Sequence, residues 1–150
     1  MLIGLKPEWE FELLKYDEAI REYVERLRRN RGQPNFNLKY FQYLAVLFTE
    51  ILLDRYYNDR QRFLIELNTF LENFNREYGT NISPFTENDL RKIAFWMATG
   101  SGKTLIMHIN YWQILKYSKN DWDNIILITP NEGLSKQHYE ELRLSGIPCK

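Results

Sequence analysis

The sequence Met97–Thr104, MATGSGKT, constrains this chain more than any other stretch. A Gly-x-Gly-Lys-Thr string between a strand and a helix is typical of a phosphate-binding loop. The apolar run Ile93–Met97 predicts a buried strand before the loop, and the residues from Leu105 onward (LIMHINYWQIL) predict a helix after it. Because Gly100 and Gly102 can adopt backbone angles closed to other residues, successive N–H groups can converge on phosphate oxygens at the start of that helix.

Two side chains of this loop carry the expected chemistry. Lys103 would reach the β- and γ-phosphates of a nucleotide, and the Thr104 hydroxyl would ligate Mg²⁺, so these two form the expected catalytic pair. The alternative is a glycine-rich turn with an exposed lysine, but the flanking strand and helix favour the phosphate site. The predicted nucleotide-binding residues of the loop are Thr99, Gly100, Ser101, Gly102, Lys103 and Thr104.

One departure from the general phosphate-loop pattern indicates a family. The pattern has a glycine five positions before Gly102, where this chain has Met97. With that residue, MATGSGKT resembles motif I of superfamily-two helicases and translocases, in which the position is commonly Ala, Met or another apolar residue. The resemblance implies ATP and Mg²⁺ as cofactors.

A second motif lies at Asn124–His138, NIILITPNEGLSKQH. The run Ile125–Ile128 predicts a strand buried on both faces of a parallel sheet, and a helix is expected to start near Asn131. TPNEGLSKQ resembles motif Ia of the same superfamily, whose loop touches the nucleic-acid backbone. The alternative is that Thr-Pro simply ends a strand. The nucleic-acid-binding residues that the resemblance implies are Thr129, Pro130, Asn131 and Gln137.

A third motif-like stretch lies upstream, at Leu38–Ala45, LKYFQYLA. It is similar to the Leu-Arg-x-Tyr-Gln-x-x-Ala signature of these motors, with Lys39 in place of the arginine and Phe41 in place of the tyrosine. By that match Gln42 would read the adenine, since an amide offers both a donor and an acceptor. The alternative, equally open, is a surface glutamine on an aromatic-rich helix.

The rest of the chain predicts helices. Apolar spacing predicts one long amphipathic helix, Glu8–Arg31, within residues 1–35. The resemblance implies that residues 36–150 form a partial RecA-like ATP-binding domain with a helical lead-in at about 38–78. The lead-in breaks at Asn58-Asp59 and ends at Gly79 as a C-cap, so it can form an antiparallel hairpin. Four arginines near the end of the first helix either complement its dipole or contact a duplex: Arg26, Arg28, Arg29 and Arg31.

Composition bounds the remaining possibilities. The 150 residues are 44% hydrophobic with formal net charge +0, so the chain can bury one core and any polyanion binding must come from local patches. The single cysteine, Cys149, argues for a reducing cytoplasm. No run is long enough to span a membrane, and the start MLIGLKPEWE is too short and too acidic for a signal peptide.

The expected fold is therefore α/β: an N-terminal helical segment followed by the opening part of a RecA-like parallel sheet of the P-loop NTPase type. The chain most resembles the motor subunits of type III and type I restriction enzymes and related DEAD/DEAH-type and phage-defence helicases. This implies an ATP-dependent DNA helicase or translocase, with double-stranded DNA, the remainder of the motor, and nuclease or methyltransferase subunits as partners.

Hydrolysis is expected to need more than this chain supplies. No apolar run ending in Asp-Glu follows the loop, so the chain reads as the ATP-binding front end of a larger motor that turns over little ATP alone. The alternative from another class is a nucleotide-binding regulatory or docking module that never hydrolyses.

Overall fold

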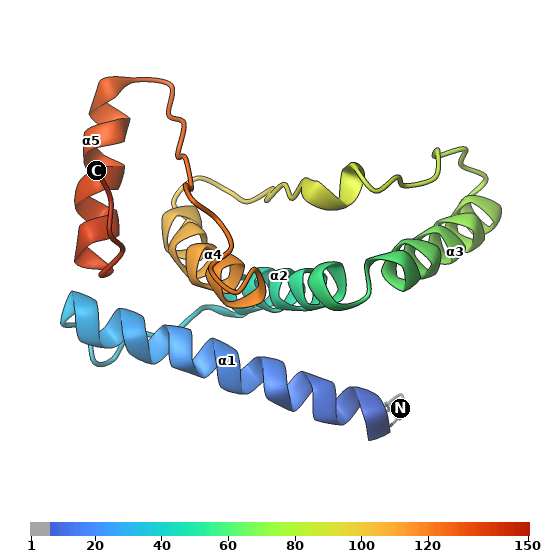
Figure 1. The fold of residues 1–150 in the computed structure, drawn as a ribbon, viewed down its shortest axis with the longest axis horizontal. Coiled ribbons are helices and arrows are strands. Elements are labelled where there is room, and N and C mark those ends of the chain that lie inside the picture. Colours follow the sequence, from blue (N-terminus) through green and yellow to red (C-terminus); the bar gives the residue numbers. More distant parts are fainter. Residues whose placement is uncertain (1–6) are drawn as a thin grey trace.

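The computed structural model describes residues 7–150, with side chains from Phe11 onward. The opening residues 1–6, on which the signal-peptide argument partly rests, lie outside the described residues. The described chain consists of helices joined by extended connections (Figure 1). The α-helices are α1 (Pro7–Arg31), α2 (Tyr40–Asn58), α3 (Arg60–Tyr78), α4 (Lys103–Tyr117) and α5 (Glu132–Leu144), with a short 3₁₀ helix at Asp89–Arg91.

The predicted α/β fold with a RecA-like parallel sheet is wrong for the described residues. They are 64% helix and contain no strand and no sheet. The two segments expected to be buried strands are exposed connections instead: Trp96 is fully exposed, and Ile126 and Ile128 are 80% and 88% exposed. A strand exists only where a second extended segment accepts and donates its backbone hydrogen bonds, and neither segment has such a neighbour in this part of the chain.

The core forms where α1, α2 and α4 pack together (Figure 1). Tyr23 of α1 stacks on Trp112 of α4, with ring centroids 6.3 Å apart. The amphipathic stripe expected for Glu8–Arg31 is the face of α1 that enters this core. The most buried apolar residues of the core are Ile20, Leu27, Val46, Ile106, Ile109, Trp112 and Ile147.

The helical lead-in bends at one residue. The Asp59 side chain accepts from Arg62 N and caps the start of α3. Gly79 ends α3 in the left-handed conformation with φ +63°, which confirms the predicted C-cap. The antiparallel hairpin that the sequence allows is not the arrangement drawn in Figure 1, where α3 leads away from α2.

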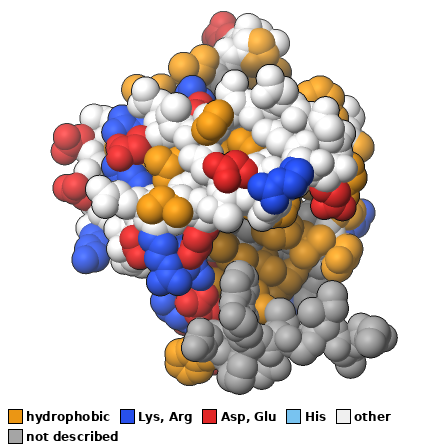
Figure 2. Space-filling view, turned by 90° about the vertical axis from the view of Figure 1, so that its right-hand side faces the viewer, with side chains coloured by type: hydrophobic (Ala, Val, Ile, Leu, Met, Phe, Trp, Pro, Cys, Tyr) orange, Lys and Arg blue, Asp and Glu red, His pale blue; other side chains and the backbone are white. Residues whose placement is uncertain are grey.

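The surface carries both signs of charge. On the side shown in Figure 2, acidic and basic side chains are interspersed with apolar ones. This distribution agrees with the zero net charge, and this face offers no broad field of one sign. Among the helices described, none is long and apolar enough to cross a membrane.

A buried carboxyl group ties α2 to α4. Glu50 of α2 is completely buried, and its oxygens accept from Gln113 Nε2 (2.6 Å), Lys116 Nζ (2.5 Å) and Tyr117 OH (2.9 Å) of α4. Burial and the neighbouring Glu50 raise the pKa of Tyr117, so its phenol remains a donor. Gln113 also donates to the Val46 carbonyl (2.9 Å), which fixes the register of the two helices.

We predict that Glu50→Gln lowers the free energy of unfolding by about 1–3 kcal/mol, because at least one of the three donors to this buried carboxyl group would then face an amide NH₂ group. Urea unfolding followed by circular dichroism measures the change. Arg62→Ala, which removes the exposed ion pair to Glu66, is the control and should change the free energy of unfolding by less than about 1 kcal/mol. Equal effects of the two substitutions would contradict a central role for the buried carboxyl group.

Candidate functional site

The candidate phosphate loop is a tight turn that leads directly into α4. Ser101 N donates to the Ala98 carbonyl (3.2 Å), and Gly100 and Gly102 have φ of +75° and +87°. Helix α4 begins at Lys103, and the first N–H groups of any helix have no partner within it. The six loop residues predicted from the sequence therefore lie together at a helix N-terminus, where an anion is favoured.

The lysine of the loop is folded back over it. Lys103 Nζ donates to the carbonyls of Met97 and Ala98, both at 2.9 Å. The Ser101 hydroxyl is buried and has no hydrogen-bond partner among the described residues. A buried hydroxyl without a partner is costly, so the Ser101 hydroxyl remains available to make a hydrogen bond.

Gln42 lies against this loop, although 59 positions separate it from Ser101. The side chain is 6% exposed; its Nε2 donates to the Ser101 carbonyl (2.6 Å) and its Oε1 accepts from Lys39 N (2.8 Å). A Cβ added at Gly102 would overlap Gln42 Nε2. Gln42 is thus neither a surface residue nor a free amide, because it bridges the start of α2 and the phosphate loop.

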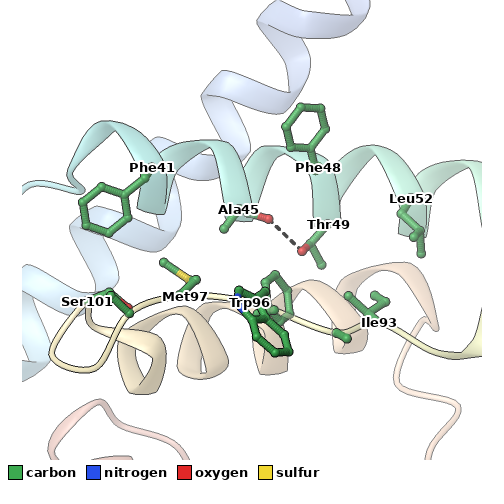
Figure 3. A pocket seen from close by; sticks show the side chains of 12 residues that line it. Phe41, Ala45, Phe48, Thr49, Leu52, Ile93, Trp96, Met97 and Ser101 are labelled. Carbon is green, nitrogen blue, oxygen red and sulfur yellow. Dashed lines mark hydrogen bonds between the residues drawn. The ribbon is translucent and has the colours of Figure 1, made fainter. Parts of the chain in front are cut away.

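A groove runs from the loop between α2 and the extended segment before it. Its volume is about 570 Å³ and its lining is mostly apolar. In Figure 3, Met97 points toward α2, and Phe41 lies at the end of the groove nearest Ser101. The lining residues are Phe41, Ala45, Phe48, Thr49 and Leu52 of α2 and Ile93–Ala98 and Ser101 of the segment and loop.

The second predicted group lies at the start of α5. Asn131 is the N-cap, and its side chain accepts from Leu134 N (2.9 Å), as expected from the sequence. The Thr129 hydroxyl donates to the Asn131 carbonyl (3.1 Å) and also contacts Ser135 Oγ. Pro130 and Gln137 are exposed. No hydrogen bond joins this group to the phosphate loop within the described residues.

Most of the arginines at the C-terminal end of α1 contact other residues of the protein. The Arg26 guanidinium lies 4.7 Å from the centre of the Trp112 ring, and Arg28 donates to a backbone carbonyl (2.7 Å). Arg31 pairs with Glu141 of α5 (2.5 Å). Three of the four arginines therefore have partners within the chain, which disfavours a dedicated duplex-contacting patch here.

Sequence reasoning missed the buried polar residues on α4. His108 and Gln113 are fully buried, and both stand within the apolar run LIMHINYWQIL. Polar side chains inside an otherwise apolar helical run are the signal that could have identified them, since such groups must find partners when buried.

Comparison with known proteins gives the class and then the family. The loop and its flanking sequence had indicated a superfamily-two helicase, and a family model described as "Type III restriction enzyme, res subunit" matches residues 15–149. The chain belongs to this family, which is one of the superfamily-two helicase families. The family consists of helicase-type ATPases, whose members generally use ATP and Mg²⁺, and membership implies DNA and further subunits as partners. Among curated proteins and solved structures, none matches this chain.

The contact between Gln42 and Gly102 generates a prediction about the loop. Gly102→Ala should destabilise the protein by more than about 1–2 kcal/mol, the ordinary cost of a left-handed non-glycine residue, because its Cβ also overlaps Gln42. In a Gln42→Ala background the overlap disappears and only the backbone cost remains. A double-mutant cycle in urea should thus show a coupling energy of about 0.5–3 kcal/mol, and additive effects would rule out the contact.

Proposed function

We propose that this chain is the ATP-binding part of an ATP-dependent DNA helicase or translocase of a restriction system. The observation that carries the proposal is the glycine turn at residues 99–102, which leads into α4 with Lys103 at its first position. Family membership supports the same reading. The loop offers backbone N–H groups, a lysine and a hydroxyl at one helix N-terminus, which is the donor set that a polyphosphate requires.

The residues of the loop fit a magnesium nucleotide. Lys103 now donates to two carbonyls, and a phosphate oxygen is a stronger, charged acceptor for its ammonium group. Thr104 follows directly and would supply its hydroxyl to Mg²⁺. When bound, Mg²⁺ neutralises charge on the β- and γ-phosphate oxygens. The backbone from Thr99 to Gly102 would cradle the phosphates, and its unpartnered Ser101 hydroxyl supports this assignment.

Gln42 is proposed to contact the adenine beside Ser101, which lines the loop end of the apolar groove, although Gln42 itself does not line the groove. Its amide already has two partners, so contact with a base would require it to release the Ser101 carbonyl or Lys39 N. Binding of the base would then directly change the contact between Gln42 and the candidate phosphate loop.

We predict that residues 1–150 alone bind Mg·ATP weakly and release almost no phosphate, because no apolar run ending in Asp-Glu follows the loop within them. Lys103→Ala should weaken binding of a fluorescent ATP analogue roughly 10- to 150-fold, the equivalent of about 1.5–3 kcal/mol for charged hydrogen bonds. Lys92→Ala, a change in an exposed lysine before the loop, is the matched control and should bind normally.

Either of two outcomes would contradict this prediction. The first is equal binding by Lys103→Ala and the control, which would place the nucleotide elsewhere. The second is steady-state phosphate release at a rate usual for helicases, about 1 s⁻¹ or faster, which would show that these residues supply every group needed for hydrolysis.

Nucleic-acid contact is proposed at the start of α5. The N–H groups of its first turn that Asn131 does not cap, together with the Thr129 hydroxyl once it releases the Asn131 carbonyl, would hold a DNA phosphate without reading its sequence. Thr129, Pro130 and Asn131 lie on this turn, and Gln137 lies exposed on the same helix.

Thr129→Val is predicted to weaken binding to a short DNA duplex about three- to tenfold, the loss of roughly one hydrogen bond, while ATP binding is unchanged. Fluorescence anisotropy at several salt concentrations measures this. Thr69→Val on α3, where the hydroxyl likewise donates to a backbone carbonyl, is the matched control. If the duplex binds Thr129→Val and wild type equally, or binds neither, the non-hydrolysing docking module becomes the better account of the chain.

A further inference from the structure

Helix α5 is attached to the rest of the protein at its C-terminal end. No residue of α5 itself is buried, whereas Ser145, directly after it, is completely buried. Asn30 Nδ2 of α1 donates to the Ser145 carbonyl (2.7 Å), and Figure 1 shows this end of α5 beside the end of α1. The start of α5, where nucleic-acid contact is proposed, lies at the opposite end of the helix.

One buried hydroxyl joins three helices at this point. Ser145 Oγ accepts from Arg31 Nη1 of α1 (2.9 Å) and lies 2.8 Å from Nδ1 of His108 on α4. Arg31 also pairs with Glu141 on the last turn of α5 (2.5 Å). We call these four residues, Arg31, His108, Glu141 and Ser145, the Ser145 joint.

The groups around His108 favour its neutral imidazole. Burial and the nearby Arg31 lower the pKa of His108 to about 4, against smaller opposing effects of Glu141. His138 of α5 is the other titratable group that faces it. A neutral His108 can share the Ser145 hydroxyl with the guanidinium without placing two cations together.

The joint lies between the two proposed binding sites. His108 is five positions after Lys103 on the same helix, about 7–8 Å along its axis. Helix α5 lies between the proposed DNA contact at Thr129 and Ser145. The hydrogen bonds of the joint are directional, so a tilt of α5 either keeps them or breaks them and thereby affects α4 as well.

We infer that the Ser145 joint couples nucleic-acid binding at the start of α5 to nucleotide affinity at the phosphate loop. The inference rests on the proposed function of those two sites. Arg31, His108 and Ser145 act as positioning residues, since they touch neither ligand. By thermodynamic reciprocity, DNA then changes nucleotide affinity by the same factor as the nucleotide changes DNA affinity.

The test measures this factor directly. The dissociation constant of fluorescent Mg·ADP is determined with and without a saturating short DNA duplex, in wild type and in Ser145→Ala. The ratio of the two constants should be about 5- to 150-fold in wild type and should fall to near 1 in Ser145→Ala. Each ligand alone should bind the variant within about twofold of wild type, a pattern that simple loss of stability does not produce.

Two further variants complete the test. Ser118→Ala removes another buried serine, at the end of α4 and outside the joint, and should keep the wild-type ratio. Glu141→Gln removes the half-exposed partner of Arg31 and should lower the ratio even if Ser145→Ala fails to fold. An unchanged ratio in Ser145→Ala or, where that variant is unfolded, in Glu141→Gln overturns the inference, as does equal loss in Ser118→Ala.

The wild-type protein separates this inference from the function it rests on. If the duplex binds but nucleotide binding does not respond to it, the coupling inference fails and the two proposed sites stand. Failure of the wild type to bind the duplex or Mg·ADP overturns the proposed function and the inference with it.

Discussion

The buried carboxyl group of Glu50 is the interaction on which the arrangement of the helices depends. It sits between α2 and α4 and accepts from three side chains of α4, so the two helices have one register in which all these donors are satisfied. The same register places Gln42, two turns before Glu50, against the phosphate loop at the start of α4. The geometry of the loop is thus set partly by a polar contact well away from it.

Much of the helical structure follows from the sequence, and the sheet does not. Apolar spacing of three and four located α1, α2 and α3, and Asp59 and Gly79 marked ends that the structure confirms. The prediction of strands at Ile93–Met97 and Ile125–Ile128 was wrong for a physical reason. A short apolar run shows only that its side chains avoid water, whereas a strand also needs a neighbouring backbone, which no local pattern encodes.

Some parts of the candidate site could likewise be predicted from the sequence, and others could not. The candidate phosphate loop could be predicted because the expected chemistry is contained in consecutive residues whose spacing is fixed by the turn. The contact of Gln42 with Ser101 could be suspected only through resemblance, since it joins residues far apart in the sequence. The polar cluster around Ser145 was not predictable, because its members come from α1, α4 and α5 and each one alone resembles an ordinary helix residue.

The exposed segment Ile125–Ile128 has a consequence for the behaviour of the protein in solution. Its side chains are between 43% and 88% exposed, and within the described residues its backbone pairs with no other extended segment. An apolar run held extended with an open edge is a template for another copy of the same run, and natural proteins commonly protect such edges with charges or a covering element. Self-association of this chain should therefore rise with its concentration, and binding constants refer to the monomer only in dilute solution.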